Sequence, residues 1–267
     1  MKASTGSPVG LDVSWLAFRV TWRNIRVYSR GWLWSVMPNL FEPIFYLLAM
    51  GIGLGSFMAT SRNWPAHLSY AAFVGTGLIA QAALFSPTFE LLYGGYSRLT
   101  HQKTYDAILA TPVSVDDLTI GEIAWGAARS VWYGCLITLV IAPFHILTSW
   151  WILLVPIPLV IAGIFFSSVA ICFVATASSY DFFNLYLSLV LFPMFLFSGI
   201  FFPLNALPVW AQQVAWWLPL THLVTLCRAL AFGNLHLALL GDLAWFLVAS
   251  LPALALALLL MRRRLIH

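Results

Sequence analysis

Lysine is almost missing from this chain of 267 residues, which contains only Lys2 and Lys103. A nucleotide-binding P-loop ends in Gly-Lys-Ser/Thr, because the lysine must reach the outer oxygens of phosphates that the glycine-rich turn holds. Lys2 follows a methionine and Lys103 follows a glutamine, so neither can serve in such a loop. The sequence therefore excludes a P-loop ATPase of its own, and uphill transport would draw its energy from a partner or an ion gradient.

Charged residues of every kind are scarce as well. They make up 8% of the chain, while hydrophobic residues make up 61%; soluble domains have roughly 25% charged residues. The net charge of +4 is concentrated in segments expected at one membrane face, which favours anionic lipids over nucleic acid as its partner. This composition predicts an integral membrane protein without an attached soluble domain.

Motifs for metal binding and covalent catalysis are also missing. The six histidines form no His-x-x-x-His pair, and no Gly-x-Ser-x-Gly elbow occurs. Cys135, Cys172 and Cys227 have no Cys-x-x-Cys spacing, so we interpret them as small packing residues. We predict no catalytic residue, no cofactor-binding residue and no metal ligand in this chain.

Long apolar runs recur along the whole sequence. A helix needs roughly 20 apolar residues to cross about 30 Å of hydrocarbon, and the runs are continuous, whereas strands of a membrane barrel alternate over about 10 residues. We predict an all-α integral membrane protein with six transmembrane helices. The predicted spans are residues 33–57, 68–92, 118–142, 151–177, 185–202 and 239–261.

Basic residues are concentrated before the first span, between the second and third, and after the last. They are Lys2, Arg19, Arg23, Arg26, Arg30, Arg98, Lys103, Arg262, Arg263 and Arg264. Segments on the opposite side carry only Arg62 and Arg228. The positive-inside rule and the even number of spans both predict cytoplasmic termini.

The segment before the first span predicts an amphipathic helix that lies in the membrane interface. Four arginines recur at intervals of 4, 3 and 4 residues and so form one helical stripe. They are Arg19, Arg23, Arg26 and Arg30. A neighbouring apolar stripe consists of Trp15, Phe18, Trp22 and Ile25. Positive-inside anchoring alone would explain the same residues. We predict a cytoplasmic N-terminal segment at residues 1–32 and a transmembrane domain at residues 33–267.

The only long polar stretch in the interior of the chain, residues 93–118, separates the second and third spans. Gly94 and Gly95 interrupt the second span, and Pro112 disfavours helix at the residue before it. About three helical turns fit between them, at residues 99–109. A short helix with polar and apolar faces suits a peripheral partner, although a solvated connector would have a similar composition.

Five ionisable residues lie at membrane depth, where charges usually face a bundle interior or a water path. Glu122 and Arg129 are seven residues apart, on the same face of one helix but slightly too far apart for a direct pair. We expect a second subunit or a lipid headgroup to complete them. Scattered single charges favour structural or gating pairs over a proton relay. The five are Glu42, Glu90, Glu122, Arg129 and Asp242.

Glu42 lies between Pro38 and Pro43, roughly 15 Å into the first span. An isolated charge at this depth is costly, so we expect its carboxylate to contact a polar side chain or to face a cargo path.

Residues 192–219 contain four prolines and end the fifth predicted span. A short helix fits residues 207–218, with Pro208 near its first position and Trp210, Val214 and Trp217 on one face. It is too short to span, so we expect it in or on the outer leaflet. It is either an exit lip for an amphipathic cargo or an interfacial anchor.

Two stretches carry a family resemblance. The first reads Tyr105-Asp-Ala-Ile-Leu-Ala-Thr-Pro112 and continues with Gly121-Glu-Ile-Ala-Trp125. The second includes Tyr180-Asp-Phe-Phe183 and Leu218-Pro-Leu-Thr-His222 and ends in Arg228-Ala-Leu-Ala-Phe-Gly233. They resemble the membrane subunits of type-2 ABC exporters and, within them, the nodulation protein J family of lipo-chitooligosaccharide exporters. The resemblance covers nearly the whole chain.

The resemblance implies a homodimer with two copies of a separate ABC ATPase, which would hold ATP and Mg. It implies a multi-pass subunit in a bacterial inner membrane that exports an amphipathic lipid-linked or acylated oligosaccharide. It places re-entrant external helices at residues 204–220 and a coupling helix at residues 99–109. The coupling residues would be Leu99, Lys103, Tyr105, Asp106, Ile108 and Leu109. We take Phe192, Phe195 and Phe201, together with Glu42, as candidates for the translocation path.

Three alternatives remain open at this point. A multidrug or small-lipophile exporter of the same superfamily would have a similar sequence. An ion-coupled secondary transporter would show inverted repeats, and none is evident. A membrane-embedded transferase would need clustered catalytic groups, which only four residues approach. These are His222, Arg228, His236 and Asp242.

Overall fold

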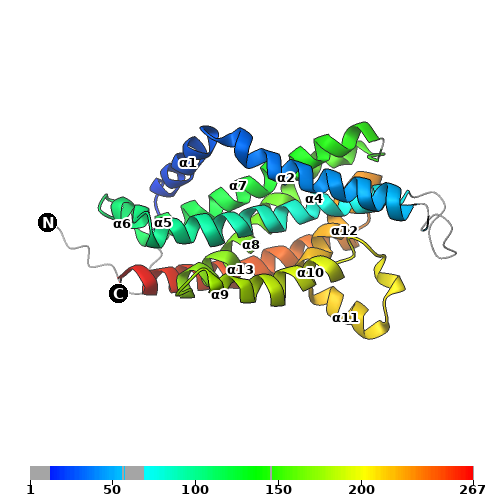
Figure 1. The fold of residues 1–267 in the computed structure, drawn as a ribbon. Coiled ribbons are helices and arrows are strands. Elements are labelled where there is room, and N and C mark those ends of the chain that lie inside the picture. Colours follow the sequence, from blue (N-terminus) through cyan, green and yellow to red (C-terminus); the bar gives the residue numbers. More distant parts are fainter. Residues whose placement is uncertain (1–12, 56, 58–68, 145, 267) are drawn as a thin grey trace.

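The computed structural model describes residues 13–55, 57, 69–144 and 146–266. These residues are mainly helical and contain no strand, which confirms the predicted all-α fold. Figure 1 shows an elongated bundle in which most helices run along one common direction. The longer helices are α1 (Leu16–Ser29), α2 (Trp32–Tyr46), α4 (Tyr70–Phe89), α7 (Val115–Ile141), α8 (Pro156–Thr176), α12 (Pro219–Phe232) and α13 (Ala238–Ile266).

Five helices of the described part of the chain are long and apolar enough to cross a membrane. They are Trp32–Gly51, Tyr70–Thr100, Val115–Phe144, Trp150–Thr176 and Ala238–Ile266. The remaining predicted span, residues 185–202, corresponds to the shorter apolar helix Asp181–Phe197, which joins α9 (Asp181–Tyr186), a π-helical turn and α10 (Phe192–Phe197). Prediction and structure therefore agree on a multi-span helical membrane protein.

The span that begins with α4 is the centre of the bundle. Of its apolar stretch, 89% is buried, against 18% for the span that begins with α2 and 17% for α13. Helix α4 packs against α7, α8 and α12. The outward faces of α2 and α13 are therefore left for lipid or for another protein.

Helices α7 and α8 are held at close range by a reciprocal arrangement of glycine and serine. Gly126 of α7 faces Ser167 of α8, and Gly163 of α8 faces Ser130 of α7. A Cβ atom added to Gly163 would lie 2.7 Å from the Ser130 hydroxyl oxygen, and one added to Gly126 would overlap Ser167. Small residues allow such close approach between membrane helices, so these four positions fix the separation of α7 and α8.

Helix α1 packs on the N-terminal half of α7. Its buried face includes Ala17 and Val20, and the Thr21 hydroxyl donates to the Gly121 carbonyl at 2.9 Å. The opposite face is exposed and carries the aromatic residues predicted for the interface, with Trp15 65% and Phe18 56% exposed. The predicted amphipathic helix at the N-terminus is present.

The short helix predicted at residues 207–218 is α11 (Val209–Trp217), which begins directly after Pro208. Trp210, Val214 and Trp217, which were predicted to share one face of this helix, are all more than half exposed. Helices α11 and α12 meet at 87°, at the end of the molecule that lies farthest from the C-terminal end of α13 (Figure 1). The short helix is therefore confirmed, and with α12 it forms a sharply bent pair, as a re-entrant segment would.

The predicted continuous helix at residues 99–109 is wrong in one respect. Two short helices occupy this region, α5 (Tyr96–Thr100) and α6 (Thr104–Leu109). Lys103 between them has φ of 52°, a left-handed conformation that cannot continue an α-helix. The segment therefore makes a sharp corner at the same end of the bundle as the C-terminal end of α13 (Figure 1).

Candidate functional site

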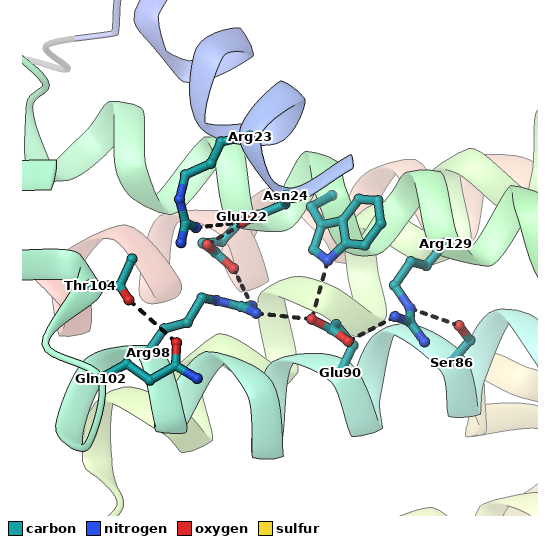
Figure 2. Close-up of polar contacts among 10 residues, drawn as sticks. Arg23, Asn24, Ser86, Glu90, Arg98, Gln102, Thr104, Glu122 and Arg129 are labelled. Atoms are coloured by element: carbon teal, nitrogen blue, oxygen red, sulfur yellow. Dashed lines mark hydrogen bonds and ion pairs between the residues drawn. The ribbon is translucent and has the colours of Figure 1, made fainter. Parts of the chain in front are cut away.

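Four charged side chains form a buried network where α4 continues towards α5. Arg98 Nη1 lies 3.0 Å from Glu90 Oε1, and Arg98 Nη2 lies 2.7 Å from Glu122 Oε2. Arg129 Nη1 lies 2.7 Å from Glu90 Oε2. Figure 2 shows the chain of contacts that runs from Glu122 through Arg98 and Glu90 to Arg129. Two carboxylates and two guanidinium groups balance each other in charge, which limits the cost of burying them.

Helix periodicity explains why these residues meet. Glu90 and Arg98 are eight residues apart, and Glu122 and Arg129 are seven apart, so each helix presents its acid and its base on one face, two turns apart. Glu90 also begins a π-helical turn, Glu90–Gly95, a distortion that is frequent at functional sites. The two helices run antiparallel, so Glu90 faces Arg129 and Arg98 faces Glu122.

The network is almost fully enclosed, and most of its polar atoms are hydrogen-bonded, although Arg98 Nε is buried without a partner among the described residues. Glu122 is 0% and Arg129 is 9% exposed. The Trp125 indole donates to Glu90 Oε1 at 3.3 Å, and Arg129 Nε donates to Ser86 Oγ at 3.3 Å. Removing one partner from such a buried pair costs about 3–5 kcal/mol, because the other charge is left uncompensated.

Helix α1 is tied to the same network. Asn24 Nδ2 donates to the second oxygen of Glu122 at 2.9 Å, and Arg23 Nη1 donates to the Asn24 side chain at 2.9 Å. The Arg129 guanidinium also lies over the ring of Tyr28, 5.2 Å from its centroid. Three separate parts of the chain, α1, the α4–α5 region and α7, therefore share one polar cluster (Figure 2).

Tyr105 of α6 packs directly below this cluster and is 0% exposed. Its hydroxyl lies beside Arg98 and Glu122 but makes no hydrogen bond within the described residues. Burial raises the pKa of the Tyr105 phenol well above its usual value of 10.0, so the ring stays neutral. Leu99 is also buried, at 7% exposed. Of the residues expected at the coupling helix, these two are thus enclosed by their own chain.

The surface of the α5–α6 corner is polar and exposed. Lys103 and Asp106 form a loose ion pair of 3.9 Å, and their side chains are 69% and 59% exposed. His101 and Gln102 are exposed beside them, and Ile108 is partly buried. Leu109 likewise packs partly against the core. This corner is thus an exposed polar tip whose inner side rests on the charge network.

The partners of Glu122 and Arg129 differ from those expected. The sequence predicted that a second subunit or a headgroup would complete them, but Glu90 and Arg98 of the same chain do so. Spacing alone contained the signal, since Glu90 and Arg98 recur at nearly the same interval on the preceding helix. What spacing could not supply was the antiparallel register of the two helices.

Glu42 has a polar partner and is also open to the outside of the chain. Gln81 Nε2 donates to Glu42 Oε1 at 3.2 Å, yet the Glu42 residue is exposed on α2. An exposed carboxylate in a membrane span is costly in lipid, so this face of α2 needs water or protein beside it.

The three phenylalanines expected along a path are not equivalent. Phe195 and Phe201 are each 5% exposed and pack against one another with ring centroids 5.1 Å apart. The ring of Tyr46 lies 5.9 Å from that of Phe201, which joins α2 to this outer aromatic cluster. Phe192 is 45% exposed and is the one of the three whose side chain is open to the outside of the chain.

The arginine stripe of α1 lies mainly on the outside. Arg19 and Arg26 are exposed and stack over Trp15 and Trp22, with 5.2 and 5.6 Å between the guanidinium carbon and the ring centroid. Arg30 is exposed as well, whereas Arg23 is partly buried through its contact with Asn24.

The four residues considered for a transferase do not form one cluster. His222 Nδ1 lies 2.6 Å from Asp242 Oδ1. Arg228 instead donates to two backbone carbonyls, and His236 contacts the carbonyl of Asn234. Within the described residues, no group of three or more His, Cys, Asp or Glu side chains is placed to hold a metal ion.

Comparison with known proteins agrees with this architecture. The ABC-2 type transporter family model matches residues 16–232. Nodulation protein J of Rhizobium leguminosarum bv. viciae is 37% identical over 85% of both chains, and that of Rhizobium meliloti strain 1021 is 35% identical over 94% of both. The inner membrane transport permease YadH of Escherichia coli K12 is 24% identical over 80% of this chain and 82% of its own.

The family model thus covers the α1 helix, the charge network, the α5–α6 corner and the bent α11–α12 pair. This chain belongs to the ABC-2 type transporter family and is a membrane-spanning transporter subunit.

Proposed function

We propose that this chain is the permease of an ABC exporter in the bacterial inner membrane, driven by a separate ATPase that holds ATP and Mg. The observation that carries the proposal is the buried charge network. It connects an exposed polar tip at Lys103 and Asp106 with α1 and α7. Both termini would face the cytoplasm, where the tip would meet the ATPase.

The tip suits a peripheral partner because its polar side chains are available while its apolar ones are already buried. Lys103 and Asp106 would make the contacts, and Tyr105 would anchor the tip to its own bundle. A displacement of α6 would press on Tyr105 and hence on Arg98, Glu122 and α1. An enclosed network of mutually paired charges resists deformation, so it would transmit such a displacement instead of absorbing it.

The second element of the proposal is a homodimer built on the exposed faces of α2 and the segment Asp181–Phe197. These faces carry bulky apolar side chains, such as Phe45 at 63% and Leu189 at 72% exposed. Glu42 lies on the α2 face as well. A second copy would cover the apolar residues and leave an aqueous cavity for the carboxylate, with Phe192 at its wall.

The cargo we propose is an amphipathic lipid-linked or acylated oligosaccharide. A path that combines exposed aromatic rings with a carboxylate fits a molecule with both an acyl chain and sugars, since rings stack on sugars and pack on chains. The similarity to nodulation protein J supports the same class. A small lipophile exporter of the same family is the competing assignment, and it would have no need of Glu42.

Co-purification and ATP hydrolysis test the assignment. The chain is co-expressed with ABC ATPases of its source organism, and the complex that co-purifies is reconstituted in vesicles and assayed with an acylated oligosaccharide. We expect no hydrolysis by the chain alone and stimulated hydrolysis by the complex. Transport that continues without the ATPase and follows a proton gradient would instead identify an ion-coupled transporter.

The tip is tested by replacing Lys103 and Asp106 together with alanine. Loss of these rim contacts should reduce stimulated hydrolysis by about tenfold, equivalent to about 1.4 kcal/mol of interface energy, while thermal stability stays unchanged. Arg263→Ala is the matched control, since Arg263 is an exposed charge at the same end of the bundle. Equal activity of both variants would exclude the tip as the coupling surface.

A further inference from the structure

Arg228 is a cation enclosed by the bundle that has no carboxylate partner. Its Nη2 donates to the carbonyls of Phe73 and Gly199 at 3.2 and 3.0 Å, and its guanidinium lies 3.7 Å from the Phe73 ring centroid. Its Nε is buried without a hydrogen-bond partner. Of the nine acidic residues in the sequence, none among the eight described ones forms an ion pair with it.

The other enclosed arginines are different. Arg98, Arg129 and Arg262 each pair with at least one carboxylate. Backbone carbonyls and a ring face stabilise a guanidinium only in part, because they carry no net charge. Arg228 therefore keeps uncompensated positive charge and an unused donor.

A cavity of about 620 Å³ opens beside this charge. It lies between the start of α4, the loop before α8 and the end of α12, at the end of the bundle near α11 (Figure 1). Its polar lining beside Arg228 comes from Ser69, Thr148, Thr225, Asn234 and His236, and its apolar lining includes Phe73 and Phe232. No carboxylate lines it among the described residues.

We propose that this cavity binds a phosphate group, either on a lipid headgroup or free in solution. The guanidinium fork matches the geometry of phosphate oxygens, and the amide, hydroxyl and imidazole groups of the lining offer further donors. The apolar wall at Phe73 and Phe232 is where the glycerol and first acyl carbons of a lipid would pack. This site is independent of the cargo path and of the ATPase.

Thermal unfolding of the purified full-length chain in a neutral detergent tests the proposal, because a bound molecule stabilises the folded state. The probes are short-chain phosphatidylglycerol, short-chain phosphatidylcholine and inorganic phosphate, each at matched ionic strength. A saturating probe should raise the Tm by roughly 5 °C. A rise with phosphatidylglycerol alone identifies an anionic lipid as the source, and an equal rise with inorganic phosphate identifies the free anion.

The variants separate this site from general charge attraction. Arg228→Gln should abolish the rise, and Arg228→Lys should retain part of it because it keeps the charge without the fork. Arg263→Gln, which removes an exposed charge at the other end of the bundle, should leave the rise unchanged. If Arg228→Gln does not fold, the rise in Tm of the parent and of Arg228→Lys still tests the proposal. No rise with any probe in the parent, or an equal rise in Arg228→Lys and Arg263→Gln, would overturn the proposal.

Discussion

Arg98 and Arg228 are both enclosed arginines, placed near opposite ends of the span Tyr70–Thr100, and their surroundings differ in kind. Arg98 lies between two carboxylates of its own chain, whereas Arg228 contacts only carbonyls and a ring. Arg98 belongs to a charge-balanced network that holds helices together. Arg228 has no carboxylate partner and has a cavity beside it. Paired charges thus mark the part of this bundle that must stay assembled, and the unpaired charge marks a place for something external.

The largest effect on stability should come from removing one charge of the balanced network around Arg98. Arg98→Met leaves Glu122 buried at 0% exposed without its cation, which should cost about 3–5 kcal/mol of unfolding free energy. Thermal unfolding in detergent measures it. Adding Glu122→Gln should restore more than half of the loss, since Glu90 and Arg129 remain as a neutral pair. If the double variant is no more stable than the single one, the network is not a coupled unit.

Removing the unpaired charge of Arg228 should have a smaller effect on stability. Arg228→Met gives up two hydrogen bonds and a ring contact but also removes the cost of burying a lone cation, for a net loss of about 1 kcal/mol. The same unfolding assay, run beside Arg98→Met, makes the comparison direct. A loss as large as that of Arg98→Met would mean that Arg228 has a structural role like that of the paired arginines.

Glu42 lies between these two cases, since it has a neutral partner. Glu42→Gln keeps the shape and the contact with Gln81, so stability should change by no more than about 0.5 kcal/mol. Transport of the acylated oligosaccharide should nevertheless fall if the carboxylate faces the cavity. Gln81→Leu removes the partner and leaves the charge, which separates the two contributions. Unchanged transport in Glu42→Gln would leave packing as its role.

The smallest effect on stability should come from the Tyr105 hydroxyl beside the charge network. The Tyr105 pKa is raised on folding, so the folded state retains its proton where the unfolded state loses it, and stability falls as pH rises above about 10. Below that pH, Tyr105→Phe should equal the parent within about 0.5 kcal/mol, because the hydroxyl has no hydrogen-bond partner among the described residues. Between pH 10 and 11 the variant should lose less stability than the parent. If stability falls equally with pH in the parent and in Tyr105→Phe, the raised pKa does not belong to Tyr105.

Much of the fold followed from patterns that act over short distances. Span positions depend on local apolarity, α11 on Pro208 and the length of its run, and the arginine stripe of α1 on helix periodicity. The break at Lys103 was missed, since a left-handed residue without glycine has little signature in sequence. The burial of Tyr105 under its own chain could not be predicted, because amphipathic spacing identifies an apolar face but not what covers it.

The candidate site was predictable only in parts. Three members stood out as charges inside apolar runs, namely Glu90, Glu122 and Arg129. Arg98 contributed only to the distribution of basic residues that predicts orientation in the membrane. Their meeting depends on the register between α7 and the span that begins with α4, which no spacing within one helix determines. The cavity beside Arg228 required the packing of three separate segments.

The glycine and serine contacts between α7 and α8 divide the subunit into a fixed and a mobile part. With each glycine facing a serine of the other helix, any axial slip would drive a side chain into a backbone, so the pair can rotate or tilt only as one body. Among the described residues, the α2 span and the segment Asp181–Phe197 have no reciprocal glycine and serine contacts of this kind, and they expose much of their surface. Opening and closing of a path should therefore occur by displacement of these outer segments against a stationary α7–α8 frame.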